Sequence, residues 1–254
     1  GLRYFGREGE TEALQDISLS VKPGEFIAII GQSGCGKSTL LSLISGILKP
    51  TEGQVLVDGQ PVTGPSRKVG YMLQQDYLFE WRTILENAVI GAEIQGADMG
   101  KARERATQLL TRYGLGQFLQ HLPRQLSGGM RQRVALARTL AVDPTVLLLD
   151  EPFSAVDAQT RITLQQELAQ TLKRAGKTAL LITHDLLEAV TLSDRVLVMS
   201  RRPGRIIDEI AIDIPGRDDP LLRRHDAKIS GYVNHLMDKL GIGSVGAPDQ
   251  RVPA

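Results

Sequence analysis

Short runs of aliphatic and β-branched residues recur along the chain and predict its strands. The runs cover residues 26–30, 55–58, 69–73, 146–150, 179–183 and 195–200. Several are apolar at nearly every position, which is typical of strands covered on both faces. Helical patterns alternate with the later runs, at 160–175 and 185–192. This alternation predicts an α/β fold with a parallel sheet.

Two parts of the chain depart from this alternation. Residues 1–25 and 51–64 combine short strand patterns with Gly-rich turns, which predicts a small antiparallel sheet. Residues from about 77 to 143 lack a buried strand and are mainly helical, and the apolar residues of 101–113 fall on one stripe of a helix. We expect a helical subdomain inserted into a single domain that covers residues 1–240, followed by a flexible Gly/Pro-rich tail at 241–254.

The composition of the 254-residue chain limits its environment without indicating a partner. Lys and Arg number 30 and Asp and Glu 29, so the basic excess expected of a nucleic-acid-binding protein is missing and no nucleic-acid partner is expected. Cys35 is the only cysteine, which excludes an intramolecular disulfide and favours a reducing compartment. The apolar runs are far shorter than the roughly 20 residues of a membrane-spanning helix, so at a membrane the chain would act as a peripheral subunit.

A glycine-rich loop follows the first apolar run and precedes an apolar helix. It fits the pattern GxxxxGK[ST] with Gly31, Gln32, Ser33, Gly34, Cys35, Gly36, Lys37, Ser38 and Thr39. Between a strand and a helix, such a loop curls its backbone N–H groups around an oxyanion, and the helix N-terminus adds partial positive charge. Lys37 can reach the β- and γ-phosphates, and the Ser38 hydroxyl can ligate Mg²⁺. Residues 31–39, here called the phosphate cradle, therefore predict a nucleoside-triphosphate site.

Two other apolar runs end in residues suited to hydrolysis. Asp150 and Glu151 end the run that starts at 146, and we expect that strand to lie beside the cradle strand with its carboxyl end at the ligand. Asp150 would hold Mg²⁺ through a water molecule, and Glu151 would act as general base on the attacking water. Neighbouring side chains of a strand diverge, so adjacent acids can take different roles. His184 follows the run 179–183 and would sense the γ-phosphate and hold Glu151 and water in line.

A second anion site is predicted at the start of a helix near residue 128. Ser127 is a good N-cap, and Gly128 and Gly129 expose the backbone N–H groups of the first turn. Here the sequence resembles the ATP-binding-cassette (ABC) ATPases, whose signature is Leu-Ser-Gly-Gly-Gln, with Met130 in place of the usual Gln. The resemblance extends from about residue 4 to residue 205 and implies a P-loop NTPase core.

The resemblance assigns roles to further residues. Residues 69–74 look like the family's Q-loop, in which Gln74 coordinates Mg²⁺ and responds to the γ-phosphate, with Gln75 as an alternative. Residues 154–157 match the loop that communicates across the ATPase dimer and ends at Asp157. Tyr4, or alternatively Phe5, fits the aromatic residue that stacks on adenine.

The family arrangement implies that two chains pack head to tail. Each chain would supply its cradle to one ATP–Mg²⁺ and its Ser127–Gly129 turn to the other. Bound ATP would hold the dimer closed, and hydrolysis would reopen it. A homodimer is expected, and a pair of unlike ATPases also fits the sequence.

The chain has one cassette and neither fused membrane helices nor a coiled-coil insert, which favours an importer subunit within the family. Residues 126–133 and 200–205 resemble the nitrate/sulfonate/taurine importer branch, whose solutes are small anions or heteroaromatics. This implies a peripheral position on the cytoplasmic face of the inner membrane, an integral-membrane permease and, indirectly, an extracytoplasmic solute-binding protein. The aromatic segment 77–81 lies where the family docks the permease's coupling helix, and the arginines of 200–205 are expected on a solvated turn. An export or lipid-trafficking complex and a non-transport ATPase switch are the alternatives.

Overall fold

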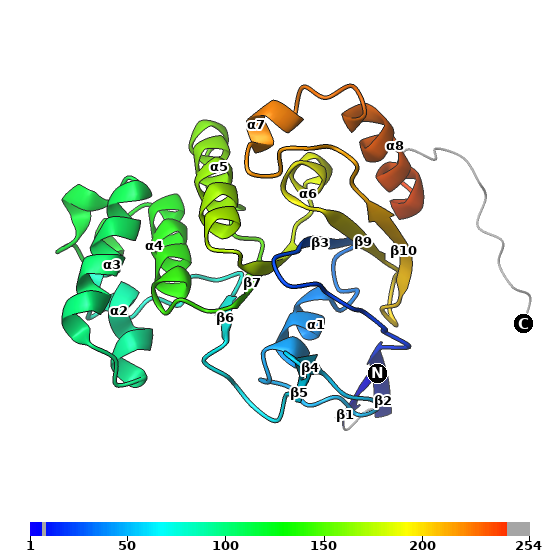
Figure 1. Cartoon of the computed structure of the whole chain (residues 1–254). Coiled ribbons are helices and arrows are strands. Elements are labelled where there is room, and N and C mark those ends of the chain that lie inside the picture. The colour runs from blue at the N-terminus through cyan, green and yellow to red at the C-terminus, as the bar shows by residue number, and fades with distance from the viewer. Residues whose placement is uncertain (7–8, 243–254) are drawn as a thin grey trace, which may run out of the picture.

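A computed structural model of the protein describes residues 1–6 and 9–242. Its centre is a six-stranded sheet in the order β10-β9-β3-β8-β7-β6 (Figure 1). The strands are β3 (Phe26–Gly31), β6 (Val69–Met72), β7 (Val146–Asp150), β8 (Thr178–Ile182), β9 (Arg195–Met199) and β10 (Ile206–Ala211). β10 runs antiparallel to β9, and the other neighbours are parallel. The predicted parallel sheet is present, with one antiparallel strand at its edge.

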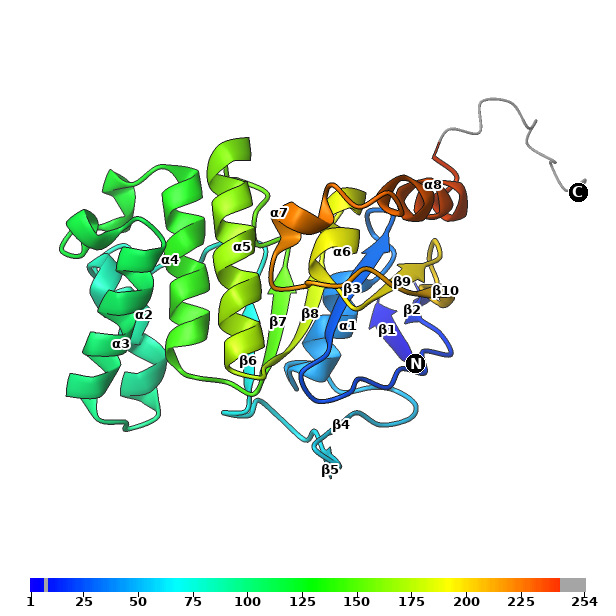
Figure 2. The same cartoon turned by 45° about the horizontal axis from the view of Figure 1, so that its top comes forward.

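Helices cover both faces of this sheet. α1 (Lys37–Ile44) packs on one face, and α5 (Ala158–Arg174) and α6 (Leu186–Leu192) pack on the other (Figures 1 and 2). β3 shows the alternation, since Ile27 and Ile29 join the core under α1 whereas Ala28 and Ile30 join the core under α6. Burial on both faces explains why the strand sequences are continuous apolar runs.

The strand that ends in Asp150 does not lie beside the cradle strand. β8 pairs with β3 on one side and with β7 on the other, so the expected pairing of 146–150 with 26–30 is wrong. Parallel neighbours are joined by long crossovers, and a later strand can therefore insert between two earlier ones. Because β3, β8 and β7 are parallel, their carboxyl ends still share one edge of the sheet.

A layer of helices fills the chain between β6 and β7. It consists of α2 (Ile84–Ile94), α3 (Met99–Arg112) and α4 (Gly128–Ala141), with 3-10 turns at Gly116–Phe118 and Pro123–Gln125. Thr83 and Glu86 start α2 with a capping box. The stripe predicted within 101–113 is buried, and it comprises Ala102, Ala106, Leu109, Leu110 and Tyr113. The layer stands at the β6 end of the sheet (Figure 1).

The predicted antiparallel part consists of two ribbons. One pairs β1 (Leu2–Gly6) with β2 (Gly9–Leu14), and the other pairs β4 (Leu56–Val57) with β5 (Gln60–Pro61). The two form separate sheets rather than the single one expected. The backbone N–H of Thr51 donates to the carbonyl of Gly1 at 3.1 Å, which brings the chain before β4 next to β1.

Between β10 and residue 242 the chain forms two more helices, α7 (Pro220–Arg223) and α8 (Ile229–Leu240). Leu236 of α8 is buried in the same core as Val196 and Val198 of β9. Residues 243–254 of the predicted tail lie outside the described residues. Within the described part of the chain, every helix is too short or too polar to cross a membrane.

Candidate active site

The phosphate cradle joins the carboxyl end of β3 to α1. Gly36 is the N-cap of α1 with a φ of 102°, and Gly34 has a φ of 76°. Both values lie in the left-handed region that favours glycine. At Gly36 a Cβ would also lie 2.7 Å from Leu14 Cδ2, so any larger residue there would clash with the end of β2. The N–H groups of the first turn of α1 have no partners within the helix and are suited to an anion.

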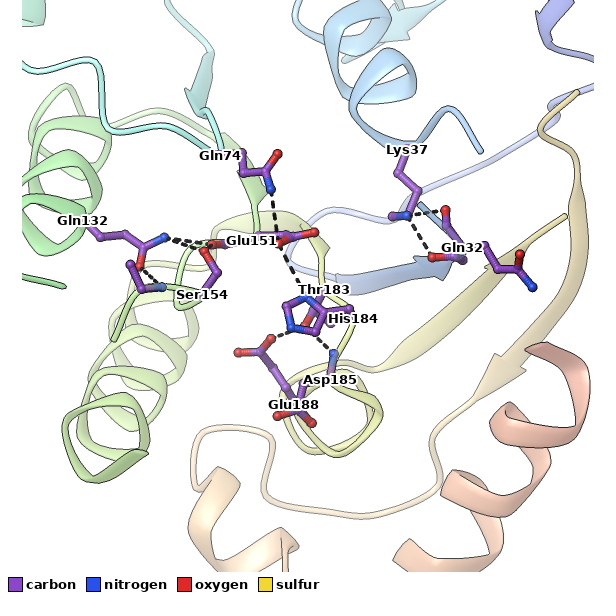
Figure 3. Close-up of polar contacts among 12 residues, drawn as sticks. Gln32, Lys37, Gln74, Gln132, Glu151, Ser154, Thr183, His184, Asp185 and Glu188 are labelled. Atoms are coloured by element: carbon purple, nitrogen blue, oxygen red, sulfur yellow. Dashed lines mark hydrogen bonds and ion pairs between the residues drawn. The ribbon is translucent and has the colours of Figure 1, made fainter. Parts of the chain in front are cut away.

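The ammonium of Lys37 is held by the cradle's own backbone. Its Nζ donates to the carbonyl oxygens of Gly31 and Gln32 at 2.8 and 2.9 Å (Figure 3). Gln32 is exposed and its Oε1 accepts a hydrogen bond from Arg201 at 2.9 Å. Arg201 is exposed on its turn, as expected, and its guanidinium also reaches the cradle.

Asp150 lies next to Ser38. The carboxyl group is buried at the end of β7 and hydrogen-bonds with the Ser38 side chain. Burial raises the pKa of Asp150, the Ser38 hydrogen bond opposes this, and the charge of Glu151 raises it further. Ser38 and Asp150, which the sequence assigns to Mg²⁺ from two distant motifs, therefore lie close together.

Glu151 lies between Gln74 and His184. Gln74 Nε2 donates to Glu151 Oε2 at 3.4 Å, and His184 Nδ1 lies 3.4 Å from the same oxygen (Figure 3). Gln74 follows β6, Glu151 follows β7 and His184 follows β8, so sheet order brings them together. Between the two candidate glutamines, Gln74 makes this contact. We call Gln74, Glu151 and His184 the hydrolysis cluster.

The backbone of Glu151 is held by a residue that sequence reasoning missed. Glu151 has a φ of 49°, a left-handed value that is strained for a residue with a Cβ. Gln132 of α4 is only 4% exposed, and its Nε2 donates to Glu151 O at 2.9 Å and to Ser154 Oγ at 3.1 Å. Its Oε1 accepts from Ala155 N at 2.9 Å. Gln132 therefore connects α4 to the loop that carries Glu151.

A sequence signal for Gln132 existed. It precedes the buried residues Ala135 and Leu136 by three and four positions, which places it on the buried stripe of α4. A buried amide requires hydrogen-bond partners, so this position predicts polar contacts. The identity of those partners depends on the fold.

The signature turn opens α4 as predicted. Ser127 is the N-cap, and its hydroxyl accepts from Met130 N at 3.3 Å. A Cβ at Gly129 would lie 2.9 Å from the carbonyl oxygen of Ala155, so the helix start packs closely on the loop after Glu151. In the described part of the chain, no hydrogen bond joins Ser127, Gly128 or Gly129 to residues 31–39.

Asp157 and Tyr4 lie outside the cradle and the hydrolysis cluster. Asp157 is the N-cap of α5 and accepts from Thr160 N at 3.0 Å, a contact that lowers the pKa of Asp157. Tyr4 is exposed on β1 opposite Thr11 of β2, and β2 continues to Leu14, which packs against the cradle. The structure thus shows a local capping role for Asp157 and an accessible ring for Tyr4.

The aromatic segment after Gln74 is mostly on the surface. Tyr77 is 60% and Trp81 75% exposed, and Phe79 stacks edge-on against Trp81 with ring centroids 5.3 Å apart. Leu78 is buried in the helical layer and is not part of this surface. Arg138 of α4 donates to the carbonyl oxygen of Tyr77 at 2.8 Å, so the signature helix holds the segment.

The phosphate cradle and the hydrolysis cluster lie at one edge of a parallel sheet. This arrangement defines a P-loop nucleoside triphosphatase. Residues 14–154 match the family model described as ABC transporter, and the chain belongs to this family. It is an ATP-binding and ATP-hydrolysing subunit of the ABC transporter type. The family resemblance and the ATPase activity predicted from the motifs are confirmed.

Several relatives are ATP-binding proteins of importers. The nitrate import ATP-binding protein NrtD of Synechocystis is 44% identical over 85% of this chain and 81% of its own length. The taurine import ATP-binding protein TauB of Burkholderia pseudomallei is 46% identical over 84% of this chain and 82% of its own. The ABC transporter ATP-binding protein YtlC of Bacillus subtilis is 47% identical over 80% and 78%. The resemblance to the nitrate/taurine branch is therefore confirmed.

Solved ABC cassettes share the fold. The ATP-binding cassette MJ0796, in a dimeric post-hydrolysis state bound to ADP and Pi, gives a TM-score of 0.77 at 35% identity. A second dimeric structure of MJ0796 gives 0.78 at 35% identity, and both matches cover 84% of this chain and 96% of the other. The predicted fold class is confirmed, with a P-loop core, antiparallel ribbons and inserted helices.

Proposed function

We propose that this chain powers the import of a small solute through a separate membrane permease. The observation that carries its hydrolytic role is the position of Glu151 between Gln74 and His184 at the edge of the sheet that holds the phosphate cradle. The importer assignment is supported by relatives named for nitrate and taurine import at 44% and 46% identity. One ATPase domain covers residues 1–240, and the cargo belongs to the small anionic or heteroaromatic class.

The phosphates of ATP bind in the cradle, against the backbone N–H groups of residues 31–39 and the start of α1. Lys37 leaves the carbonyl oxygens of Gly31 and Gln32 and turns to the β- and γ-phosphates. Tyr4 stacks on the adenine from the β1–β2 ribbon. Because the glycines already hold the loop curled, binding requires little reorganisation beyond the lysine.

The residues near the cradle fit Mg²⁺. Ser38 and Gln74 offer a hydroxyl and an amide oxygen, and Asp150 offers a carboxylate that already contacts Ser38. Oxygen donors of this kind are the ligands that Mg²⁺ prefers. The ion would neutralise part of the phosphate charge during hydrolysis.

Hydrolysis uses Glu151 as general base. Its carboxylate accepts a proton from water as the water oxygen attacks the γ-phosphorus, and the bond to the β–γ bridging oxygen breaks with its electron pair leaving on ADP. His184 and Gln74 both contact Glu151 Oε2 and keep the carboxylate and the water in line.

A second chain completes each site. The Ser127–Gly128–Gly129 turn lies at the N-terminus of α4, where it can donate to the γ-phosphate of ATP bound by the partner chain. Charged hydrogen bonds of this kind contribute about 1.5–3 kcal/mol each, so ATP holds the dimer and its hydrolysis releases it. Asp157 follows the loop that faces the partner. Identical chains suffice for this arrangement.

The exposed aromatic residues supply the contact with the permease. A hollow of ≈470 Å³ beside Trp81 is lined also by Arg82, Glu86, Val89, Glu93, Met99 and Arg103, and it can receive a short cytoplasmic helix. Arg131 and Arg138 of α4 bind Asp76 and Tyr77, so movement of the signature turn would reach this surface. The chain then lies on the cytoplasmic face of the membrane, and a solute-binding protein acts from the other side.

The test is a mild-detergent pull-down of the chain from its native membranes, followed by measurement of ATP hydrolysis. We expect a multi-helix permease in stoichiometric amount, lost in Trp81→Ala and retained in Ile94→Ala, an equally exposed residue at the far end of α2. Transport of the permease's solute into vesicles on addition of ATP would support import. Recovery of only soluble partners, or transport in the outward direction, would contradict the proposal.

A further inference from the structure

The carboxyl group of Glu188 is buried one helical turn after His184. The residue is 4% exposed and accepts hydrogen bonds from the Thr183 hydroxyl and, at 2.8 Å, from Gln165 Nε2 of α5. Burial raises the pKa of Glu188, and the two hydrogen bonds oppose that rise. A buried carboxyl is unfavourable unless its partners are well placed, so this group depends on its network.

Glu188 fixes the backbone on both sides of His184. Thr183 Oγ1, which donates to Glu188, also accepts from Asp185 N at 3.0 Å. Asp185 Oδ1 in turn accepts from Glu188 N at 3.0 Å and caps α6. Residues 183 and 185 are therefore both tied to Glu188 (Figure 3).

The His184 ring depends on that backbone for its position. Its side chain is 70% exposed, and Glu151 is its one side-chain partner in the described part of the chain. Glu188 also lines a cavity of ≈20 Å³ with Glu151 and His184. This space is sufficient for about one water molecule, so the network borders the place where the hydrolysis cluster meets solvent.

The network continues to the chain's C-terminal part. Arg224, which follows α7, donates to Gln165 Oε1 at 2.9 Å and so turns the Gln165 amide nitrogen toward Glu188. Its neighbour Arg223 is buried and donates to the carbonyl oxygens of Thr191 and Ser193 at the end of α6. Residues 223 and 224 thus hold α6 at its end and, through Gln165, near its start.

We propose that Glu188 is a positioning residue for His184, and that Arg224 supports it through Gln165. The inference rests on the role given to His184 in the proposed function. Neither Glu188 nor Arg224 contacts the cradle, so both should act on turnover rather than on ATP binding. A displacement of about 1 Å in a catalytic group can reduce turnover by about 100-fold, which sets the scale of the effect.

The first measurement is steady-state ATP hydrolysis by the full chain. Glu188→Ala should lower kcat by about 10-fold or more, with KM for ATP little changed. Glu188→Gln should recover most of kcat, because its amide can accept from Gln165 and donate to Thr183. Arg224→Ala should give a smaller loss, and Arg105→Ala, which removes a comparable contact to Asp143 in the helical layer, should give none.

The second measurement repeats the substitutions in a His184→Ala background. If Glu188 and Arg224 act through His184, their substitutions should cause no further loss there. The same fold loss in both backgrounds would overturn the inference and leave the proposed function standing. Unchanged kcat in His184→Ala itself would overturn the role of His184 in the proposed function, and with it this inference. Should Glu188→Ala fail to fold, Arg224→Ala and Glu188→Gln complete the same comparison.

Discussion

The phosphate cradle and the hydrolysis cluster serve the same nucleotide but are built differently. The cradle is one uninterrupted segment whose shape comes from its glycines and the start of α1. The cluster collects side chains that follow three strands, and its Gln74–Glu151 contact spans 77 positions of sequence. A local site can fail through its own residues, whereas an assembled site can also fail through residues that never touch the nucleotide. This difference predicts separate losses of binding and of turnover.

Glu151→Gln should have the largest effect. The amide keeps the shape of the side chain but cannot take a proton from water, so kcat should fall by about 10²–10⁴. ATP binding should be retained, and ATP should trap the dimer. An ATP hydrolysis assay measures the loss of kcat, and size-exclusion chromatography with ATP detects the trapped dimer. Rapid hydrolysis by this variant would contradict the general-base role.

The two sites also differ in how far the sequence predicts them. All the cradle residues lie in one motif whose spacing requires a particular backbone, so the location of the cradle could be predicted from the sequence. The hydrolysis cluster was predicted residue by residue, but the strand order that joins it was not. β8 inserts between β3 and β7, and nothing in the sequence of 179–183 specifies its neighbours.

Support from outside the motifs was harder still to predict. Gln132 and Glu188 both lie on helices among apolar neighbours. Gln132 contacts the loop after β7, and Glu188 contacts Gln165 of another helix as well as residues just before its own helix. Periodicity shows that such residues face the interior, but only the packed helices and loops show which atoms they meet. Tertiary contacts of single polar groups carry no sequence spacing of their own.

Lys37→Ala should show the complementary loss at the cradle. Removing a charged donor to the phosphates should weaken ATP binding by about 10- to 100-fold, corresponding to about 1.5–3 kcal/mol. Isothermal titration calorimetry of the full chain provides the measurement. Lys68→Ala is the matched control, since that lysine pairs with Asp58 on the surface away from the cradle. Equal ATP affinity in the two variants would contradict the assignment of residues 31–39 as the phosphate-binding loop.

Gln132→Leu should weaken the hydrolysis cluster by removing the hydrogen bonds that hold the backbone of the Glu151 loop. It leaves the Glu151 carbonyl and the Ala155 N–H without their buried partner and should lower the unfolding free energy by about 1–3 kcal/mol. kcat should fall while ATP affinity is kept, because the cradle is untouched. Urea unfolding and the hydrolysis assay test both parts. Gln108→Leu, at an exposed position of α3, is the control and should leave both quantities unchanged. Equal losses in the two variants would contradict the role of Gln132 in holding the Glu151 loop.

The smallest expected effect is a pH dependence of the unfolding free energy that comes from Glu188, the residue that supports the hydrolysis cluster. Burial raises the pKa of Glu188 above its ordinary value of 4.5, with Asp185 raising it further and Arg161 lowering it. As the pH rises above 4.5, Glu188 therefore loses its proton at a lower pH in the unfolded chain than in the folded chain. The contribution of Glu188 to the unfolding free energy is complete below that value and declines as the pH rises toward the pKa of the folded state. The decline is at most about 1.4 kcal/mol per pH unit.

Glu188→Gln removes this titration and should flatten the dependence. Its unfolding free energy, measured in urea from acidic to neutral pH, should gain on that of the parent chain as the pH increases. Glu104→Gln, on the exposed side of α3, serves as the control and should follow the parent. Parallel curves for Glu188→Gln and the parent would mean that Glu188 titrates alike in both states. The hydrolysis cluster would then differ from the cradle only in how its contacts are assembled. The burial of Glu188, which positions His184, would make no contribution to the pH dependence of the unfolding free energy.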